Sequence, residues 1–167
     1  MKLRHRGSQG KGFTLVELLI VVIILSILAA IVVPQFASST TDAKYSALDS
    51  NLGALRAATE LYYQQHGDYP GAKASATGTA GSATAFIEQM TMFSDAAGTT
   101  AATATATIKY GPYLKKGIPV EPVSGTNAVE VITTGTLGMT ATAAKDGWKF
   151  DTKTGQLIAN TAALQTR

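Results

Sequence analysis

The chain contains no cysteine, which excludes disulfide bonds, zinc–thiolate sites and a cysteine nucleophile. Histidine occurs only at His5 and His66, which are too far apart in the sequence to show a ligand spacing. The motifs GxxxxGK[ST], HExxH and GxSxG are also absent, and no histidine is placed to act as the base of a serine or threonine. These absences leave no acid–base constellation in view and argue against an enzyme.

Charge is scarce and unevenly placed. Charged residues make up only 15% of the chain, whereas Ala, Thr, Gly and Ser are abundant, a composition typical of exported or membrane-linked chains. The formal charge of +3 arises from Lys2, Arg4, Arg6 and Lys11, which precede Phe13 without any acid among them. Without these four residues, ten basic residues stand against 11 acidic ones. We therefore expect no direct binding of nucleic acid.

A run of 21 residues from Phe13 to Val33 contains only three polar side chains, those of Thr14, Glu17 and Ser26. A helix of this length would span about 30 Å, the thickness of a bilayer core. The basic residues before it should stay in the cytoplasm, which predicts a single pass with the C-terminus outside. A secretory signal has a shorter apolar region, and a plain signal anchor does not explain the carboxylate.

The order of residues around this run resembles the class III signal of type IV pilins and type II secretion pseudopilins. A basic leader, Gly12, Phe13 and Glu17 occur together and are followed by the unbroken apolar segment. The resemblance implies that a prepilin peptidase/methyltransferase cuts after Gly12 and N-methylates the new N-terminal Phe13. It also implies residence in the inner (cytoplasmic) membrane, with an assembly platform, minor pilins and further copies of the chain as partners.

Glu17 is costly in lipid and is therefore expected to have a function. Cleavage would create an ammonium group on Phe13, about one helical turn away and at the positive end of the helix. The resemblance implies that this amine pairs with Glu17 of a neighbouring subunit. Such a pair would fix the axial register between subunits, because any slip leaves a charge unpaired in lipid.

Pro34 directly follows the apolar run and removes a helical hydrogen bond, so we predict a kink or local melting there. The helix should nevertheless continue over residues 34–66, because apolar residues recur at spacings of three and four. Gly53 is its weak point, costing about 1 kcal/mol relative to alanine. Gly67 and Pro70 follow as a natural end. The amphipathic stripe consists of Tyr45, Leu48, Leu52, Leu55, Thr59 and Tyr62.

The C-terminal part is predicted to combine loops with a small antiparallel sheet that covers the stripe. Residues 71–107 are rich in Ala, Thr, Gly and Ser and indicate surface loop, apart from a short helix expected within residues 84–95. The strand-like segments are residues 128–133, 148–151 and 156–159, the last two flanking a turn as in a hairpin. The sequence GPYL and the later GW.F…TG pattern resemble the C-terminal domain of pseudopilins.

We therefore predict an α+β, pilin-like chain in four parts. These are a cleaved leader (1–12), a transmembrane and filament-core helix (13–33), its amphipathic continuation (34–66) and a globular part (67–167). The leading interpretation is a structural subunit of a pseudopilus, most like the major pseudopilin of a type II secretion system. A type IV pilin for motility, adhesion or DNA uptake, and a minor membrane-anchored binding module, are the alternatives. Many pilins carry a disulfide, so the missing cysteines favour the pseudopilus.

No cofactor is predicted, and a calcium site is kept as the less favoured alternative. Major pseudopilins often bind calcium in a C-terminal loop, but the acids of this region are scattered and lack the regular oxygen-ligand spacing of a dedicated calcium loop. They are Glu121, Glu130, Asp146 and Asp151. The two aspartates are expected to serve turns.

Overall fold

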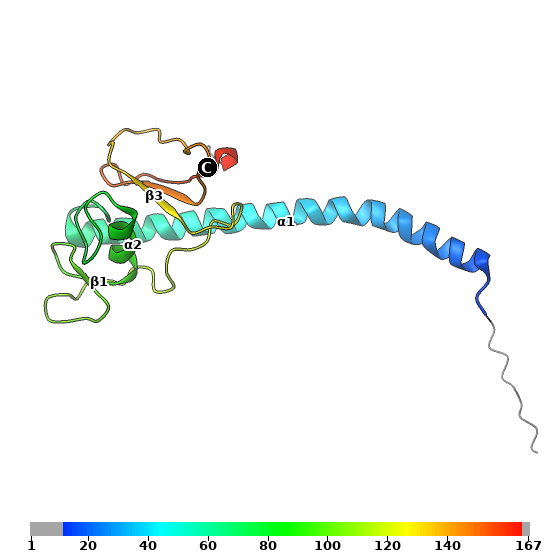
Figure 1. Cartoon of the computed structure of the whole chain (residues 1–167), viewed down its shortest axis with the longest axis horizontal. Helices are drawn as coiled ribbons and strands as arrows, with labels where there is room; N and C mark the ends of the chain where they lie inside the picture. The colour runs from blue at the N-terminus through cyan, green and yellow to red at the C-terminus, as the bar shows by residue number, and fades with distance from the viewer. Residues whose placement is uncertain (1–11, 165–167) are drawn as a thin grey trace, which may run out of the picture. The chain divides into compact units, whose positions relative to one another are not determined.

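The computed structural model describes residues 12–164, so the basic leader before Gly12 lies outside the described residues. The chain forms two compact units, residues 1–42 and 43–167. Helix α1 (Leu15–His66) contributes to both (Figure 1). The elements that follow are α2 (Ala83–Thr91), β1 (Phe93–Ser94), β2 (Thr100–Ala101), β3 (Val129–Ile132), β4 (Trp148–Asp151), β5 (Leu157–Ala159) and the short 3-10 helix η1 (Ala162–Leu164).

The first unit is the N-terminal part of α1. The helix runs without interruption through Pro34, so the predicted continuation beyond the proline is confirmed. The part of α1 around residues 15–33 is long and apolar enough to cross a membrane, and none of it is buried. Every large apolar side chain from Phe13 to Phe36 is exposed to solvent.

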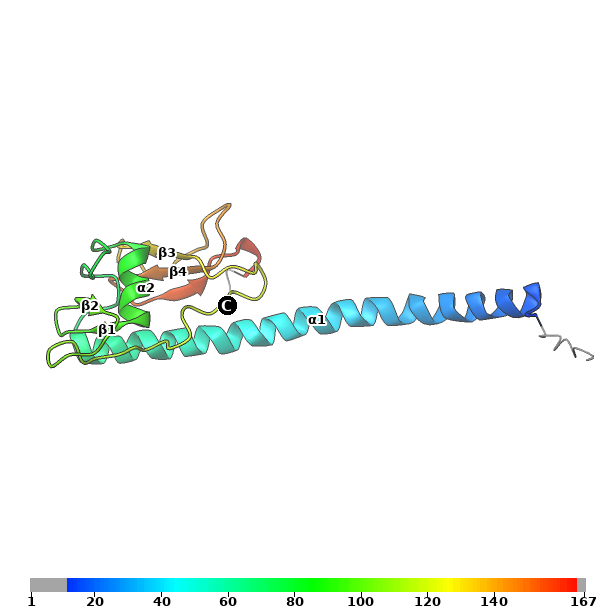
Figure 2. The same ribbon diagram turned by 60° about the horizontal axis from the view of Figure 1, so that its bottom comes forward.

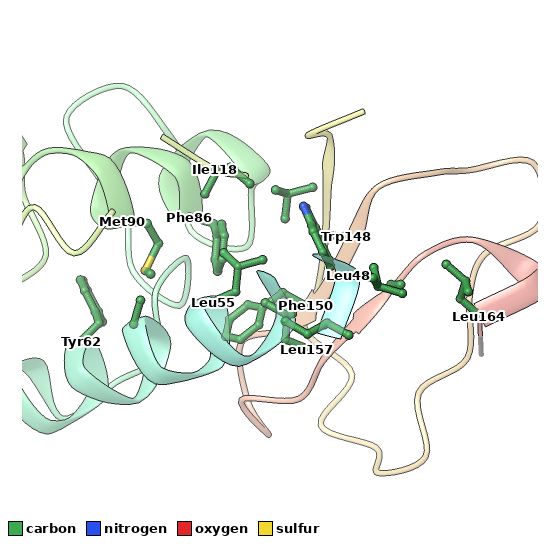
Figure 3. Packing of buried hydrophobic residues seen from close by; sticks show 14 residues of the cluster. Leu48, Leu55, Tyr62, Phe86, Met90, Ile118, Trp148, Phe150, Leu157 and Leu164 are labelled. Carbon is green, nitrogen blue, oxygen red and sulfur yellow. The ribbon is translucent and has the colours of Figure 1, made fainter. Parts of the chain in front are cut away.

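The second unit buries the amphipathic stripe of α1, as predicted. Leu48, Leu55 and Tyr62 are almost completely buried, and Tyr45 is partly covered. The stripe packs against α2 and the sheet, where the largest buried side chains are Phe86, Met90, Trp148, Phe150 and Leu157 (Figure 3). Figure 2 shows α2 and the strands β3 and β4 beside one another in this unit. The core is therefore built from three segments that are distant in sequence.

The sheet has the order β3-β4-β5. Its β4–β5 hairpin is antiparallel, with Trp148 opposite Ala159 and Phe150 opposite Leu157, which confirms the predicted hairpin and the α+β class. Strand β3 pairs with β4 in parallel, so the sheet as a whole is mixed and not antiparallel throughout. Residues 133–147 supply the crossover, since parallel neighbours need a connection of about a dozen residues or more.

Helix α2 holds parts of the predicted loop region that precede and follow it. The helix begins after Ser82, whose hydroxyl accepts from the Ala85 amide at 3.1 Å. It includes residues 84–91 of the segment 84–95 in which a short helix was predicted. The buried Gln89 accepts from the Gly71 amide at 2.7 Å and donates to the Gly98 carbonyl at 2.9 Å. One amide side chain thus joins the loop before α2 to the loop after it. The short β1–β2 pair was not predicted.

Candidate assembly site

The first described residues are fully available to an enzyme. Gly12 precedes α1 and has no neighbouring atom within 4 Å of the place where a Cβ would lie. Phe13 is 82% exposed. An unobstructed position at Gly12 is compatible with cleavage by a peptidase, and the cut after Gly12 and the methylation of Phe13 stay predictions.

Glu17 is held by its own chain at the start of α1. Its Oε2 accepts from the Thr14 backbone amide and from the Thr14 hydroxyl, both at 2.8 Å. The Glu17 amide donates in return to Thr14 Oγ1 at 3.2 Å. This reciprocal arrangement is a capping box, which satisfies free donors at a helix start. The Thr-x-x-Glu pattern that signals it is visible in the sequence, but our sequence analysis assigned no role to Thr14.

The rest of this helix surface offers no second charge. Glu17 is the only charged side chain between Phe13 and Thr41. The Ser26 hydroxyl donates to the Val22 carbonyl at 2.7 Å, so it is turned back onto its own helix. The structure therefore brings one carboxylate to one end of a long apolar surface.

The helix becomes polar immediately after Pro34. Four hydroxyl side chains donate to backbone carbonyls three or four residues earlier, those of Ser38, Ser39, Thr40 and Thr41. The accepting carbonyls belong to Gln35 and Ala37. Such back-bonding weakens and bends helices slightly. A proline and four back-bonded hydroxyls thus follow one another at the end of the apolar segment.

The C-terminal acids are engaged by protein donors. Asp151 accepts from the Gly135 amide at 2.9 Å and from the Thr134 hydroxyl at 3.0 Å. Burial opposes its charge, but these bonds lower the pKa of Asp151. Its other oxygen accepts from the Lys153 amide at 2.9 Å, so Asp151 serves the turn between β4 and β5, as expected. Within the described residues, no group of three or more His, Asp or Glu side chains is placed to hold a metal ion.

Glu121 and Glu130 are likewise occupied. Glu121 accepts from the Val123 and Ser124 amides, each at 2.7 Å. Glu130 binds Lys145 at 2.7 Å and the Asn160 amide at 3.0 Å. Burial opposes both charges, but the hydrogen bonds lower the pKa of each carboxyl group. These two acids stabilise loops of the second unit.

Comparison with known proteins agrees with the N-terminal pattern. The family described as "Prokaryotic N-terminal methylation motif" matches residues 8–33. The type II secretion system core protein G of Pseudomonas aeruginosa is 44% identical over 62 residues, which are 37% of this chain and 44% of that protein. No solved structure matches the chain.

Type IV pilins match to a similar degree. A fimbrial protein of Neisseria meningitidis serogroup B is 41% identical over 66 residues, covering 40% of this chain and 39% of that protein. The type IV major pilin protein PilA of Myxococcus xanthus is 38% identical over 69 residues, covering 41% and 31%. The chain thus matches less than half the length of these relatives. Together with the methylation motif, these matches show that the N-terminal segment is similar to that of pilin-like prepilins.

Proposed function

We propose that this chain is the precursor of a structural subunit that polymerises through α1 into a pilus-like filament. One observation carries the proposal: the apolar segment of α1 is exposed along its whole length and bears a single carboxylate near its start. Within the described residues, none of the most apolar window of this helix is buried. Lipid would cover it before assembly, and other copies of the same helix would cover it afterwards.

Processing would precede assembly. A prepilin peptidase removes residues 1–12 by cutting after Gly12, and Phe13 is then N-methylated. The methylation motif over residues 8–33 supports this step. The basic leader stays in the cytoplasm and the second unit lies outside the inner membrane. The subunit is a building element and not a catalyst, as the names of its relatives suggest.

Glu17 would then set the register. In the precursor its carboxylate is satisfied by Thr14. After cleavage, the Phe13 ammonium of an adjacent copy offers a charged donor, which makes a stronger hydrogen bond than a neutral one. A misplaced copy would leave a charge uncompensated in an apolar core. Only the axial offset that pairs the two charges avoids this penalty, so that offset between copies is favoured.

Pro34 and the residues after it would let the first part of α1 lie in the membrane or filament core while the second part lies outside it. The lost hydrogen bond at Pro34 favours a kink. Residues 13–33 form the membrane and filament-core helix, and residues 34–66 its amphipathic continuation. The latter belongs with residues 67–167, which provide the globular part on the outside of the filament.

A type II secretion pseudopilus is the preferred filament. The match to a type II secretion core protein and the absence of cysteine support it. A type IV pilus is the second candidate, because major pilins match over similar lengths. Deleting the gene in its host separates the two. Loss of protein secretion favours the pseudopilus, and loss of motility, adhesion or DNA uptake with normal secretion favours the pilus.

The test of the common function is mass spectrometry of the N-terminus, combined with filament recovery from sheared cells. The expected subunit begins with methylated Phe13 and is found in filaments. Gly12→Leu should block cutting, because a side chain hinders close approach of the backbone. Gly10→Leu, two residues upstream, is the matched control and should be cut normally. An intact N-terminus in the wild-type protein, or processed subunits that never form filaments, would overturn the proposal.

A further inference from the structure

His66 is the last residue of α1, and both nitrogens of its ring are engaged. Nδ1 lies 3.0 Å from the Tyr62 carbonyl oxygen, and Nε2 lies 3.0 Å from the Ser94 hydroxyl oxygen. A carbonyl can only accept, so Nδ1 carries the proton of the neutral ring and Nε2 accepts from the Ser94 hydroxyl. One hydroxyl thus joins this ring to strand β1, which lies beside the end of α1 (Figure 2).

Ser94 also holds the chain that follows it. The residue is completely buried. Its amide donates to the Tyr110 carbonyl at 2.9 Å, and its carbonyl accepts from the Tyr110 amide at 3.0 Å. Further along, the Gln89 side chain donates to the Gly98 carbonyl at 2.9 Å. The segment 93–110 is therefore attached to α2 near its middle and to α1 through the Ser94 hydroxyl.

Aromatic rings surround the imidazole. It stacks on Tyr62 with ring centroids 3.9 Å apart, and it meets Tyr110 and Tyr113 edge-on at 5.1 and 6.2 Å. Burial raises the pKa of Tyr62, and it raises the pKa of Tyr113 to about 12. The Lys109 ammonium lies over the Tyr110 ring, 5.6 Å from its centroid, so one positive charge is already present at this edge of the cluster. The imidazole is the side chain of this cluster whose ordinary pKa lies nearest to neutral pH.

Burial has the largest influence on the charge of this ring, and it lowers the pKa of His66 below its ordinary value of 6.5. The Tyr62 carbonyl and Asp95 act in the opposite direction, since both favour the imidazolium. The Lys73 ammonium opposes the imidazolium and is itself paired with the Asp68 carboxylate at 2.7 Å. The surroundings of the ring therefore favour its neutral form.

We infer that His66 is an acid-sensitive switch, which holds the segment 93–110 to the end of α1 while its ring is neutral and releases it when the ring is protonated. Protonation places a hydrogen on Nε2, so the buried Ser94 hydroxyl loses its acceptor and has to turn elsewhere. Because the folded pKa is below 6.5, this stabilisation is complete above about pH 6.5 and is lost as pH falls towards the folded pKa. The switch lies within the second unit and does not depend on the proposed filament.

Hydrogen exchange of the full chain in detergent tests the release. The protection of the Ser94 and Tyr110 amides, corrected for the intrinsic effect of pH on exchange, should fall severalfold between about pH 7.5 and about pH 5. The control is the Trp148 amide, which donates to the Ala128 carbonyl at 2.9 Å and should keep its protection. Unchanged protection of Ser94, or an equal loss at Trp148, would overturn the inference.

Two variants assign the effect to one side chain, because His5 is the other histidine of the chain. His66→Gln has no ring to protonate and should show the same Ser94 protection at both pH values. His5→Gln is the matched control and should behave like the wild type. Loss of protection in acid that persists in His66→Gln would contradict the switch.

An NMR titration of the wild-type ring gives a readout that does not require any variant to fold. The His66 signals should titrate below pH 6.5, and the Ser94 amide shift should follow the same curve. A ring that titrates at or above pH 6.5, or a Ser94 shift that does not follow it, would overturn the inference. A chain that forms no filaments would sink the proposed function and leave these measurements unaffected.

Discussion

The apolar residues of helix α1 are exposed in its N-terminal part and largely buried in its C-terminal part. From Phe13 to Phe36, the large apolar side chains of the described chain are all exposed. After residue 43, the apolar residues form one stripe, and that stripe is buried under α2 and the sheet. A one-sided stripe is thus covered from within the chain. A helix that is apolar all round needs cover from lipid or from other molecules.

The largest effect is expected at Glu17, the only charged side chain between Phe13 and Thr41. Glu17→Ala should still enter the membrane and be cut, because removing a charge eases insertion and Gly12 is unchanged. Filament assembly should be abolished, since an unpaired Phe13 ammonium in an apolar core costs about 3–5 kcal/mol. The measurement is filament yield beside the processed subunit in membranes.

Two further variants make this result specific. Glu17→Asp should assemble at an intermediate level, because its charge remains while its reach shortens by one methylene. Co-expression of Glu17→Ala with the wild type should reduce the wild-type yield. Normal filaments from Glu17→Ala, together with normal processing, would return Glu17 to the status of a helix-capping residue.

The two parts of α1 should also respond differently to the same deletion. Leu55→Ala removes a fully buried side chain and should lower the free energy of unfolding of the second unit by about 2–5 kcal/mol. Leu25→Ala removes an equally large but exposed side chain and should leave that free energy unchanged. Denaturation of the full chain in detergent, followed by the fluorescence of the buried Trp148, measures both. An equal loss of unfolding free energy in both variants would contradict the expected difference between the two parts of α1.

Acid should weaken the loop contacts of Glu88 in the second unit. Burial opposes the charge of Glu88, but hydrogen bonds from Ser75, Thr77 and Thr100 outweigh it and lower its pKa to about 2. A lowered pKa stabilises the fold above the unfolded value near 4.5, and the stabilisation is lost as pH falls towards 2. Glu88→Gln should therefore cost about 1–3 kcal/mol at neutral pH and nothing near pH 2.

Thermal unfolding of the two proteins across this pH range measures the difference. Glu60→Gln, which changes an exposed carboxylate on α1, serves as the matched control. A constant gap between wild type and Glu88→Gln at all pH values would contradict the assignment.

The smallest effect is expected at the start of α1. Thr14→Val keeps the shape of the side chain but removes the hydroxyl that bonds Glu17, at a cost of about 1 kcal/mol. The Glu17 amide should then exchange with solvent about fivefold faster in detergent, as seen by NMR. Ser26→Ala, further along the helix, should leave that rate unchanged. An unaltered rate in Thr14→Val would show that the cap is dispensable.

Sequence periodicity predicted the parts of the fold in which apolar residues recur at a regular spacing. The stripe from Tyr45 to Tyr62 and the hairpin around the turn at Gly155 both followed from local spacing, because neighbouring residues share one face. The helix also ended at His66, as Gly67 indicated. Among the site residues, Gly12, Phe13 and Glu17 were recognised from their order, and their roles stay predictions.

Other features depend on the path of the chain and were not accessible to local patterns. The parallel pairing of β3 with β4 is decided by how residues 133–147 cross over. Gln89 holds two loops through partners that are remote in the sequence, so its amide shows no recognisable spacing. Strands β1 and β2 contain two residues each, too few for any alternation to appear.

The Ser26 hydroxyl donates to the carbonyl of Val22, which affects how two such helices would pack side by side. From Leu18 to Val33 the lateral surface then presents only apolar groups to a neighbour. Ridges of apolar side chains recur along such a surface, so several offsets between two helices give dispersion energies of similar size. In the proposed filament, the charge at one end of the segment would therefore select one of these offsets. A free hydroxyl at residue 26 would add a competing minimum at a wrong offset.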